Sequence, residues 1–512
     1  MMFKFFEDAA LKRLNQIAIS NEISVLTYGD LLQKAEAFRQ LFTNTEHPMK
    51  VLIALPSGPE FTAVQLGTFG AAAKAIPIPF KTTENEAKSY LQLISPDLIV
   101  VQSLKASANI ITVLKDPITI LTIEDSDHHT LPHRILKWHE VTAKPDVIEK
   151  IQTRYKNLPV ETRMIQFTSG STGLPKGILI SNDNFLANLN ANKEHLAHFT
   201  GKHVFCPIPQ FHAMGNAVVW EHLCYGSPIH LANSFFYGEH LKKMRYYACS
   251  SILASPNYFK LLLKNGVLKP SNLPTLESVT VGTATVDQSL VEDFHKVFPD
   301  LTIHCRYGLS ESVGAMARLT LGPSEELSSP GLVGPPVPGA ELAPGLPSLK
   351  QEEPSEIKVK YDANAVGQLT INGQWASLLD INGYLHTGDL AYLDDSGFLH
   401  LRGRITTFLK CNGYRINPFE IETVLREIKG IQEAVVIGVP DPISEQRIVA
   451  CLEPSPNETI PNQLKLLTIC KDCLSPYKIP QQFITFEKIP RNQAGKPDRP
   501  AILNAITTYF NQ

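Results

Sequence analysis

The chain has few cysteines and no long apolar run, and both absences narrow its class. Eight Cys among 512 residues are too few for a disulfide scaffold. The one CxxC, Cys470 to Cys473, falls in a segment with a helical pattern and has no second pair, so we expect no zinc site. Nowhere do eighteen apolar residues follow one another, and residues 1–20 carry charges throughout, unlike a signal peptide. We expect a reduced, cytoplasmic protein without a membrane span.

The sequence also lacks a strong excess of either charge. It has 47 Lys and Arg against 50 Asp and Glu, a formal net charge of -3. We therefore expect neither nucleic acid nor an anionic membrane as an obligatory partner. A hydrophobic fraction of 43% is ordinary for a globular protein. The length exceeds what one hydrophobic core usually serves, which predicts two or more domains.

Short apolar runs alternate with helical patterns in the first part of the chain. Thr27 precedes a run of helical spacing and is a candidate helix cap. The helical segments are 26–43 and 60–75, and the strand-like segments are 49–56, 75–80 and 97–102; the alternation returns at 162–290. This pattern predicts layered α/β structure with largely parallel sheets.

The composition changes in the last third of the chain. Residues 321–365 are rich in Pro, Gly and Ser, which predicts loops and short hairpins. A β-rich stretch follows, with a hairpin turn expected at 394–397. A small α/β pattern begins near residue 406. We place the domain boundary at 402–404, giving an N-terminal domain of residues 1–403 and a C-terminal domain of residues 404–512.

A glycine-rich loop interrupts two apolar runs within residues 164–181. Small residues let backbone N–H groups approach phosphate oxygens, hydroxyls add donors, and a lysine adds positive charge. The candidate phosphate-binding residues are Thr168, Ser169, Gly170, Ser171, Thr172, Gly173 and Lys176. The pattern is neither the P-loop nor GxGxxG. A plain Ser/Gly loop between strands is the alternative.

The stretch TSGSTGLPKG at 168–177 resembles the signature loop of the adenylate-forming superfamily. That group includes acyl-CoA synthetases, 4-coumarate–CoA ligases, luciferases and adenylation domains of peptide synthetases. The resemblance covers nearly the whole chain, because further motifs follow in the family's order. It implies a large N-terminal α/β domain of several subdomains, one of them β-rich, and a small mobile α+β C-terminal lid. ATP, Mg²⁺ and CoA are the implied cofactors.

Three motifs of the N-terminal region carry candidate site residues. Residues 209–215 resemble PxFHxxG, whose aromatic and His212 flank the carboxylate site in the family. The stretch YGLSE at 307–311 resembles YGxTE. There an aromatic ring can stack on adenine, a hydroxyl can bond phosphate, and a carboxylate can hold Mg²⁺. The resemblance assigns nucleotide contacts to Tyr307, Gly308, Ser310, Gly282, Thr283 and Ala284, and assigns the magnesium to Glu311.

The C-terminal third carries the remaining candidates. By resemblance to YxTGDL, Asp389 accepts hydrogen bonds from both ribose hydroxyls, and Arg404 is a second nucleotide contact. Residues 490–499 resemble the PxxxxGKxxR loop, whose lysine is Lys496 here. A carboxylate attacking an α-phosphate brings two anions together, and an ammonium neutralises the charge that builds. Lys410 is implied to face the active site during thioester formation.

Two positions depart from the family pattern. Thr406 stands at the hinge, where Asp or Lys is usual, and a short β-branched residue can still rotate. Arg306 precedes the motif tyrosine, where many members have Gly, while malonyl-CoA synthetases also read RYG. A buried guanidinium needs a partner. Either Arg306 reads a second carboxylate on the substrate, or it pairs with an acidic residue of the protein or points to solvent.

The resemblance implies ATP-dependent activation of a carboxylic acid to acyl-AMP, with release of pyrophosphate, followed by transfer to CoA. The alternative is an acyl-AMP ligase that loads the phosphopantetheine thiol of a carrier protein. A light-emitting oxidative relative would share every motif. A binding module without activity would need a broken site, yet Lys496, Glu311 and Asp389 are all intact. The sequence does not fix the acid.

Overall fold

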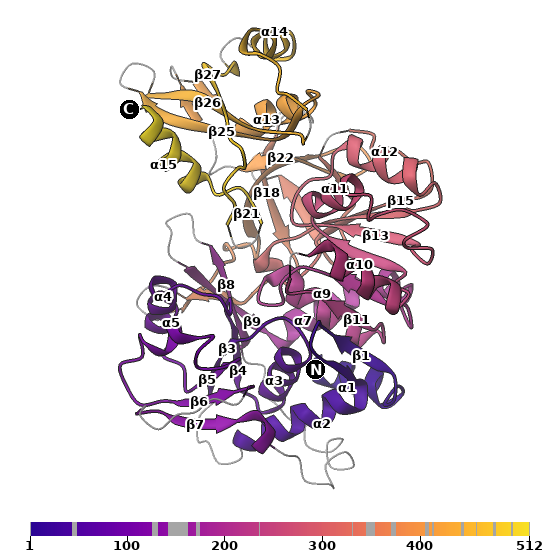
Figure 1. Ribbon diagram of the computed structural model, residues 1–512, viewed down its shortest axis with the longest axis vertical. Coiled ribbons are helices and arrows are strands. Elements are labelled where there is room, and N and C mark those ends of the chain that lie inside the picture. Colours follow the sequence, from indigo (N-terminus) through magenta and orange to yellow (C-terminus); the bar gives the residue numbers. More distant parts are fainter. Residues whose placement is uncertain are drawn as a thin grey trace. The chain divides into compact units, whose positions relative to one another are not determined.

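The computed structural model divides the chain into two compact units, which are described separately. The first contains Met1–Ala343, Lys358–His386 and Asp395–Leu399; the second contains Pro344–Ile357, Thr387–Asp394 and His400–Gln512. The structure describes residues 2–42, 49–124, 132–141, 162–169, 175–234, 236–329, 331–344, 354–369, 375–404, 409–411, 414–441, 445–456, 458–474, 478–492 and 495–510. Figure 1 labels the helices and strands.

Two large sheets organise the first unit. One has the order β20-β19-β9-β8-β4-β3-β5-β6-β7, with parallel pairing from β8 to β7 and antiparallel pairing at the other end. Its strands are β3 (Lys50–Ala54), β4 (Lys74–Pro77), β5 (Leu98–Val101), β6 (Thr119–Thr122), β7 (Arg134–Lys137), β8 (Thr162–Ser169), β9 (Pro175–Ser181), β19 (Gly367–Leu369) and β20 (Trp375–Ala376).

The second large sheet has the order β15-β14-β13-β12-β10-β11-β1-β2, with only its two terminal pairs antiparallel. Its strands are β1 (Ile17–Ser20), β2 (Val25–Thr27), β10 (Val204–Cys206), β11 (Ile229–Leu231), β12 (Ser251–Ala254), β13 (Ser278–Val281), β14 (Thr302–Tyr307) and β15 (Ala317–Leu321). The predicted α/β layering with largely parallel sheets is confirmed.

The helices that accompany these sheets follow the predicted alternation. They are α1 (Met2–Leu11), α2 (Tyr28–Arg39), α3 (Pro59–Gly70), α4 (Glu84–Ile94), α5 (Ala108–Ile111), α7 (Asn182–Ala191), α8 (Lys193–Ala197), α9 (Ala213–Cys224), α10 (Tyr237–Tyr246), α11 (Pro256–Lys264) and α12 (Gln288–Val297). Thr27 caps α2 with a reciprocal bond to Asp30, as its position predicted. In the described parts of the chain, no helix is long and apolar enough to cross a membrane.

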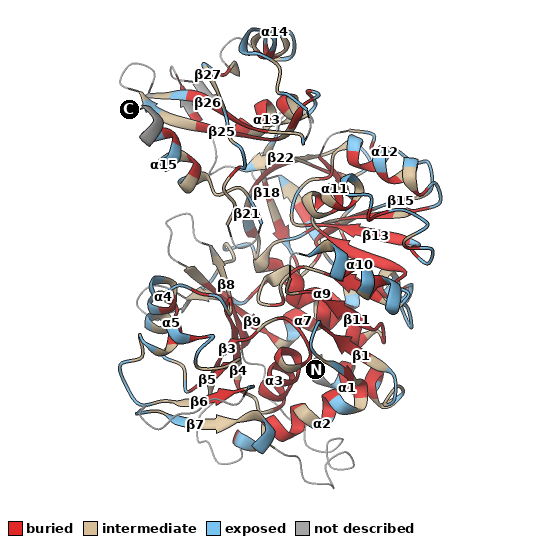
Figure 2. Ribbon diagram, in the orientation of Figure 1, coloured by how far each residue is buried: buried red, intermediate tan, exposed pale blue. Residues whose placement is uncertain are grey.

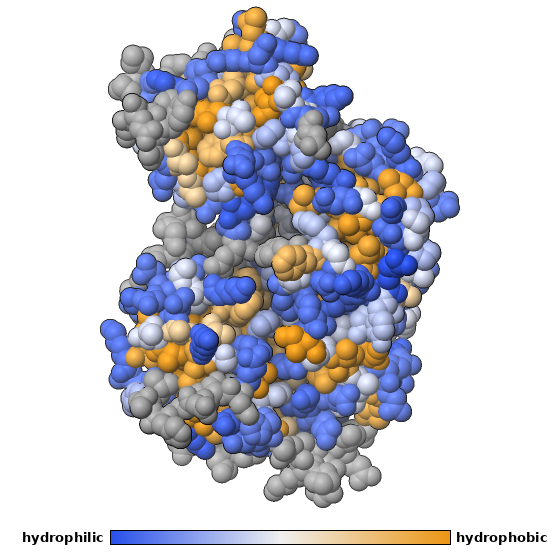
Figure 3. Space-filling view, viewed as in Figure 1, coloured by the Kyte–Doolittle hydropathy of each residue, from blue (hydrophilic) through white to orange (hydrophobic). Residues whose placement is uncertain are grey.

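A further sheet has five strands. Its order is β16-β22-β21-β18-β17, with β16 (Leu332–Gly334), β17 (Glu341–Pro344), β18 (Ser355–Lys360), β21 (Leu385–Leu393) and β22 (Leu399–Arg404). Neighbours β21 and β22 are joined by the turn at 394–397, so the predicted hairpin is confirmed. Hydrophilic residues are interspersed with smaller hydrophobic areas on the visible face of the molecule (Figure 3).

The second unit contains a small three-layer α+β domain. Its sheet has the order β25-β26-β27, with β25 (Ile431–Asp441), β26 (Glu445–Pro454) and β27 (Gln482–Thr485), beside a hairpin of β23 (Leu409–Cys411) and β24 (Tyr414–Ile416). Alternate residues of β25 and β26 point to opposite faces. One face packs against α13 (Pro418–Arg426) and α14 (Gln463–Cys473), and the other against α15 (Arg499–Phe510). Cys470 and Cys473 lie in α14, so the helical interpretation of the CxxC is confirmed.

Helices α2 and α3 pack closely because Gly67 lacks a side chain. Every residue of α3 except Glu60 is buried, as the red ribbon in Figure 2 shows. A Cβ at Gly67 would lie 2.4 Å from the Ala35 carbonyl oxygen and 3.0 Å from Phe38. A backbone atom cannot move aside as the end of a side chain can, so this helix crossing depends on glycine.

We expect Gly67→Ala to lower the free energy of unfolding by about 1–3 kcal/mol, because the added methyl overpacks the α2–α3 contact. Gly238→Ala is the matched control, since Gly238 also lies in a helix but has nothing within 4 Å of its Cβ position. The control should be neutral or slightly stabilising. Urea unfolding of both variants measures the difference. Equal stability of the two would show that α2 and α3 do not pack this closely.

Candidate active site

The glycine-rich loop connects two antiparallel neighbours of the nine-stranded sheet. The ladder of β8 and β9 pairs Thr168 with Lys176 and Ser169 with Pro175. Only residues 170–174 lie between these strands, and Gly170, Ser171, Thr172 and Gly173 fall outside the described residues. The structure thus holds the two ends of the loop side by side, with the hydroxyl of Thr168 and the ammonium of Lys176 on opposite strands.

The carboxyl ends of β13 and β14 bring two further motifs together. These strands are parallel and in register, with Val281 opposite Cys305. Gly282 and Tyr307 therefore lie at the same edge of the eight-stranded sheet, where ligands bind in open α/β folds. Gly308 follows at once, and a Cβ there would lie 2.0 Å from the Gly314 carbonyl oxygen. Glycine is required at position 308 by this close approach of two backbone segments.

Thr283 occupies a strained backbone position beside this edge. Its φ is 71°, in the left-handed region that favours glycine. A non-glycine residue there costs about 1–2 kcal/mol. A glycine would adopt this conformation without the strain, because it has no Cβ. Strained residues of this kind cluster at functional sites, which agrees with the assignment of Gly282, Thr283 and Ala284 to a binding edge.

The segment 209–215 packs against the same edge. His212 is the N-cap of α9, and its Nδ1 accepts a hydrogen bond of 3.4 Å from the Met214 backbone. Two residues on, the Met214 thioether occupies the space beside Gly282, since a Cβ on that glycine would lie 2.3 Å from the Met214 methyl carbon. His212, Gly282 and Tyr307 are thereby brought into one region of the first unit.

Two buried glutamines hold this segment, and no motif pointed to them. Gln166 lies in β8 and its Nε2 donates to the Phe211 carbonyl at 2.7 Å. Gln210 reaches the start of α3, where its Nε2 donates to Thr62 at 2.8 Å. Both side chains are 0% exposed. Gln210 falls at an unspecified position of the 209–215 motif and Gln166 lies two residues before the 168–177 stretch, and neither place says where the amide bonds.

Glu311 is the candidate magnesium ligand in the first unit. It is partly exposed and lies in a 3-10 turn, η4 (Ser310–Ser312). Among the described residues, no three His, Cys, Asp or Glu side chains are grouped closely enough to hold a metal ion. Mg²⁺ usually keeps several waters and binds through one or two carboxylates and substrate phosphates. The Glu311 carboxylate fits this donor set.

In the second unit, Asp389, Arg404 and Lys496 come together. The Arg404 Nε lies 2.7 Å from the Asp389 carboxylate, and its Nη2 donates to the Thr387 carbonyl at 3.1 Å. Lys496 is exposed to solvent over part of its surface. Its pKa lies below the ordinary value because surrounding protein desolvates the ammonium and Arg404 repels it, while Asp389 opposes the shift. Three residues drawn from separate motifs thus form one charged group.

One candidate of the second unit is described only in part, and one lies outside the described residues. Lys410 lies in β23, opposite Arg415 of β24. Its side chain falls outside the described part, as does the whole of Thr406.

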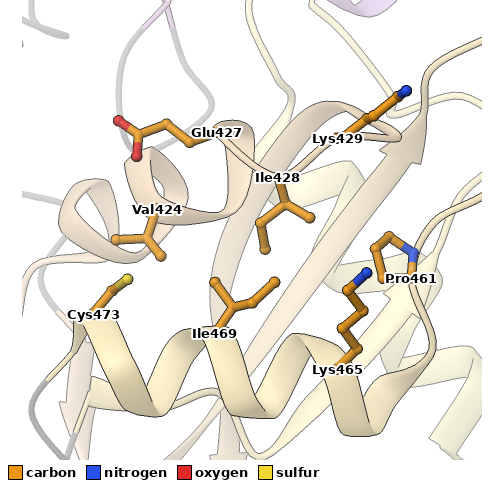
Figure 4. Close-up of a pocket in the computed structure, with 8 residues that line it drawn as sticks. All are labelled: Val424, Glu427, Ile428, Lys429, Pro461, Lys465, Ile469 and Cys473. Carbon is orange, nitrogen blue, oxygen red and sulfur yellow. The ribbon is translucent and has the colours of Figure 1, made fainter.

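A separate hollow lies between α13 and α14, where Val424, Ile428 and Ile469 face one another, with Lys465 and Cys473 beside them (Figure 4). None of the candidate site residues lines it.

Arg306 is paired inside the protein, which decides between the alternatives left open by the sequence. Its Nη1 and Nη2 lie 2.6 and 2.7 Å from the two carboxylate oxygens of Glu221 on α9. The side chains are 6% and 1% exposed. Burial raises the pKa of Glu221, but Arg306 outweighs burial and holds this pKa at about 2. The acidic neighbour exists, so the prediction that Arg306 reads a second substrate carboxylate loses its basis.

Comparisons with known proteins identify solved structures of similar fold and relatives of similar sequence. The amide bond synthetase McbA from Marinactinospora thermotolerans has a similar fold, with a TM-score of 0.84 at 20% identity over 99% of this chain and 100% of that one. A probable CoA ligase, CCL5 of Humulus lupulus, is 27% identical over 68% of this chain, and the match spans 64% of CCL5. The long-chain-fatty-acid–CoA ligase of Bacillus subtilis is 25% identical over 98% of this chain and 93% of its own length.

The fold is that of an adenylate-forming enzyme. The family model described as AMP-binding enzyme matches residues 6–376, and the model of the C-terminal domain of that enzyme matches residues 420–496. The chain belongs to the AMP-binding enzyme family. The family resemblance inferred from the motifs is confirmed.

We expect Glu221→Ala to destabilise the protein by about 3–5 kcal/mol, because it leaves the Arg306 guanidinium buried and unpaired. The double variant Glu221→Leu, Arg306→Met should lose less than either single removal, since no charge is left behind. Glu239→Ala is the control. Its exposed pair with Lys242 should contribute less than about 1 kcal/mol. Chemical unfolding at one pH compares all three. A double variant weaker than the single one would contradict the buried pair.

Proposed function

We propose that the protein is an AMP-forming acid–thiol ligase, which activates a carboxylic acid with ATP and passes the acyl group to CoA. The observation that carries the proposal is the grouping of Asp389, Arg404 and Lys496 within the second unit. A carboxylate suited to ribose hydroxyls and a catalytic lysine from a distant motif would serve one nucleotide there. Family membership and the names of the CoA ligase relatives support the same activity.

The first step joins the acid to the α-phosphorus of ATP. A carboxylate oxygen forms the new P–O bond, the bond to the leaving pyrophosphate breaks, and acyl-AMP results. Two anions must approach, so a cation between them lowers the barrier. We assign this cation to Lys496. Backbone N–H groups and hydroxyls of the glycine-rich loop, together with Lys176, would hold the phosphates, and Glu311 would hold Mg²⁺, which neutralises phosphate charge.

The second step transfers the acyl group to a thiol. The thiolate sulfur attacks the acyl carbonyl carbon, and AMP leaves with the electron pair of the broken C–O bond. The mixed anhydride is a better electrophile than the free acid, which is the advantage of two steps. We propose that residues 404–512 act as a lid, which presents Lys496 in the first step and Lys410 in the second. The phosphopantetheine thiol of a carrier protein is the alternative acceptor.

The proposal does not specify which carboxylic acid is the substrate. The pairing of Arg306 with Glu221 favours a neutral acyl chain over a dicarboxylate. His212, two residues before the Met214 that packs against Gly282, would flank the reacting carboxylate. All eight cysteines are free thiols, and we therefore propose a reducing compartment such as the cytoplasm.

The test is a pyrophosphate-release screen over short, long, aromatic and dicarboxylic acids, with CoA present. Release that depends on one acid class, with formation of its CoA thioester, supports the proposal. Release without a CoA thioester, but with acylation of a carrier protein, would replace CoA by the alternative acceptor. Failure to release pyrophosphate with any acid would contradict the activity.

We expect Lys496→Ala to slow acyl-AMP formation about 100- to 1,000-fold, since it removes the cation that offsets charge crowding in that step. Thioester formation from synthetic acyl-AMP should remain close to the wild-type rate. Single-turnover assays of the two half-reactions measure this difference. Lys488→Ala, a lysine outside every motif, is the control and should slow neither step. Equal losses in both half-reactions of Lys496→Ala would contradict the assignment.

Lys410→Ala should show the reverse pattern. If the lid presents a second face for thiol transfer, the loss of Lys410 slows thioester formation from synthetic acyl-AMP, by about 10-fold or more, and spares adenylation. The same two half-reactions are measured, with Lys496→Ala as the reciprocal reference. A slower adenylation step of similar size would show that one lid face serves both steps.

A further inference from the structure

We propose that Gln166 is a positioning residue, which ties the strand entering the glycine-rich loop to the segment that carries His212. The inference deepens the proposed function and rests on it for the identity of the two ligands. It adds a residue that no motif assigns. Its role would be to couple the phosphate-binding loop to the carboxylate-binding segment through one buried hydrogen bond.

The bond joins two motifs that are far apart in the sequence. Gln166 lies in β8, two residues before Thr168 opens the glycine-rich loop. Its Nε2 donates to the Phe211 carbonyl at 2.7 Å, and is also 3.3 Å from the Phe167 carbonyl. Phe211 directly precedes His212, the N-cap of α9. The Gln166 side chain is 0% exposed, so water does not replace this bond.

The other side of the segment is anchored independently. The Gln210 backbone N–H donates to Ser57 Oγ at 2.8 Å, and its Oε1 accepts from the Gly58 N–H at 3.2 Å. The Asn216 amide donates to the Gln210 carbonyl at 3.2 Å. Residues 209–212 are therefore held between the start of α3 on one side and β8 on the other. Gln166 supplies the β8 side.

This geometry gives Gln166 a role in coupling rather than in bulk stability. Phosphates that fix the ends of the glycine-rich loop also restrain β8, and the Gln166 bond passes that restraint to Phe211 and His212. The Oε1 atom of Gln166 has no hydrogen-bond partner among the described residues. Replacement by methionine, which has a similar volume, removes the donor and also this unpartnered acceptor, so the variant should fold.

The test compares Gln166→Met with wild type by hydrogen exchange of peptides covering 209–215, with and without ATP. We expect ATP to slow exchange there in wild type and to have no such effect in Gln166→Met. Ser227→Ala is the control: it removes another buried side-chain bond of the first unit, 2.6 Å to the Phe199 carbonyl, which joins neither β8 nor the 209–215 segment. It should respond to ATP like wild type. Unchanged ATP protection in Gln166→Met overturns the proposal.

Kinetics give a second readout that a purely structural role would not move. Gln166→Met should raise KM for the acid about 3- to 10-fold, with KM for ATP changed less. Gln166→Glu adds a pH test, because burial raises the pKa of the new carboxyl and its protonated form can donate to Phe211. Its kcat/KM relative to wild type should rise from about pH 8 to pH 6, while the ratio for Gln166→Met stays flat. Flat ratios for both variants contradict the proposal.

The two proposals fail in different ways. If wild type releases no pyrophosphate with any acid, the proposed function fails, while the exchange of 209–215 still reports whether Gln166 couples the two segments. If wild type is active and both glutamine variants match Ser227→Ala in exchange and in KM, the activity stands and the positioning role of Gln166 is wrong.

Discussion

The candidate site depends on the close approach of backbone segments at one edge of the eight-stranded sheet. Parallel pairing brings the ends of β13 and β14 level, and Gly308 allows the chain to pass against Gly314 without a side chain between them. Gly282 leaves room for the Met214 thioether, which seats the segment that carries His212. A Cβ at position 308 would push apart the backbone at Gly308 and Gly314, between which the turn that carries Glu311 lies. The chemistry proposed for this edge therefore depends on close packing of the backbone at glycines more than on any single ion pair.

A buried ion pair lies next to that edge of the sheet. Arg306 precedes Tyr307 in β14, and both of its terminal nitrogens bond the Glu221 carboxylate. Asn188 donates a further bond of 2.8 Å to this carboxylate. A buried pair with full hydrogen bonding gives little net stability but is costly to break. Its consequence for function is that the guanidinium beside the motif tyrosine is already neutralised, which argues for an acid without a second charge.

The sequence predicted the family and the local structure better than it predicted the long-range contacts. Thr27, the alternating strands, the hairpin at 394–397 and the helical CxxC were all predictable, because capping, periodicity and turn signals are local. The motif order makes Lys496, Asp389 and Glu311 candidates for the same reason, and their roles stay predictions. The contacts of Glu221, Gln166 and Gln210 were not predictable, because their partners are distant in the sequence. Gln166 bonds a residue 45 positions away, and Glu221 bonds one 85 positions away. Gln210 bonds Thr62 near the start of α3. The strain at Thr283 was likewise hidden, because φ is set by tertiary packing. The Arg306 alternatives needed the structure to decide between them.

The central claim is that the protein makes an acyl-adenylate, and isotope exchange tests it most directly. Labelled pyrophosphate is incubated with the protein, ATP, Mg²⁺ and one acid at a time, without any thiol. Reversible adenylation returns the label to ATP, so the account predicts exchange with at least one class of carboxylic acid and none when the acid is omitted. Absence of exchange with every acid class, or cleavage of ATP to ADP and phosphate, would contradict the account.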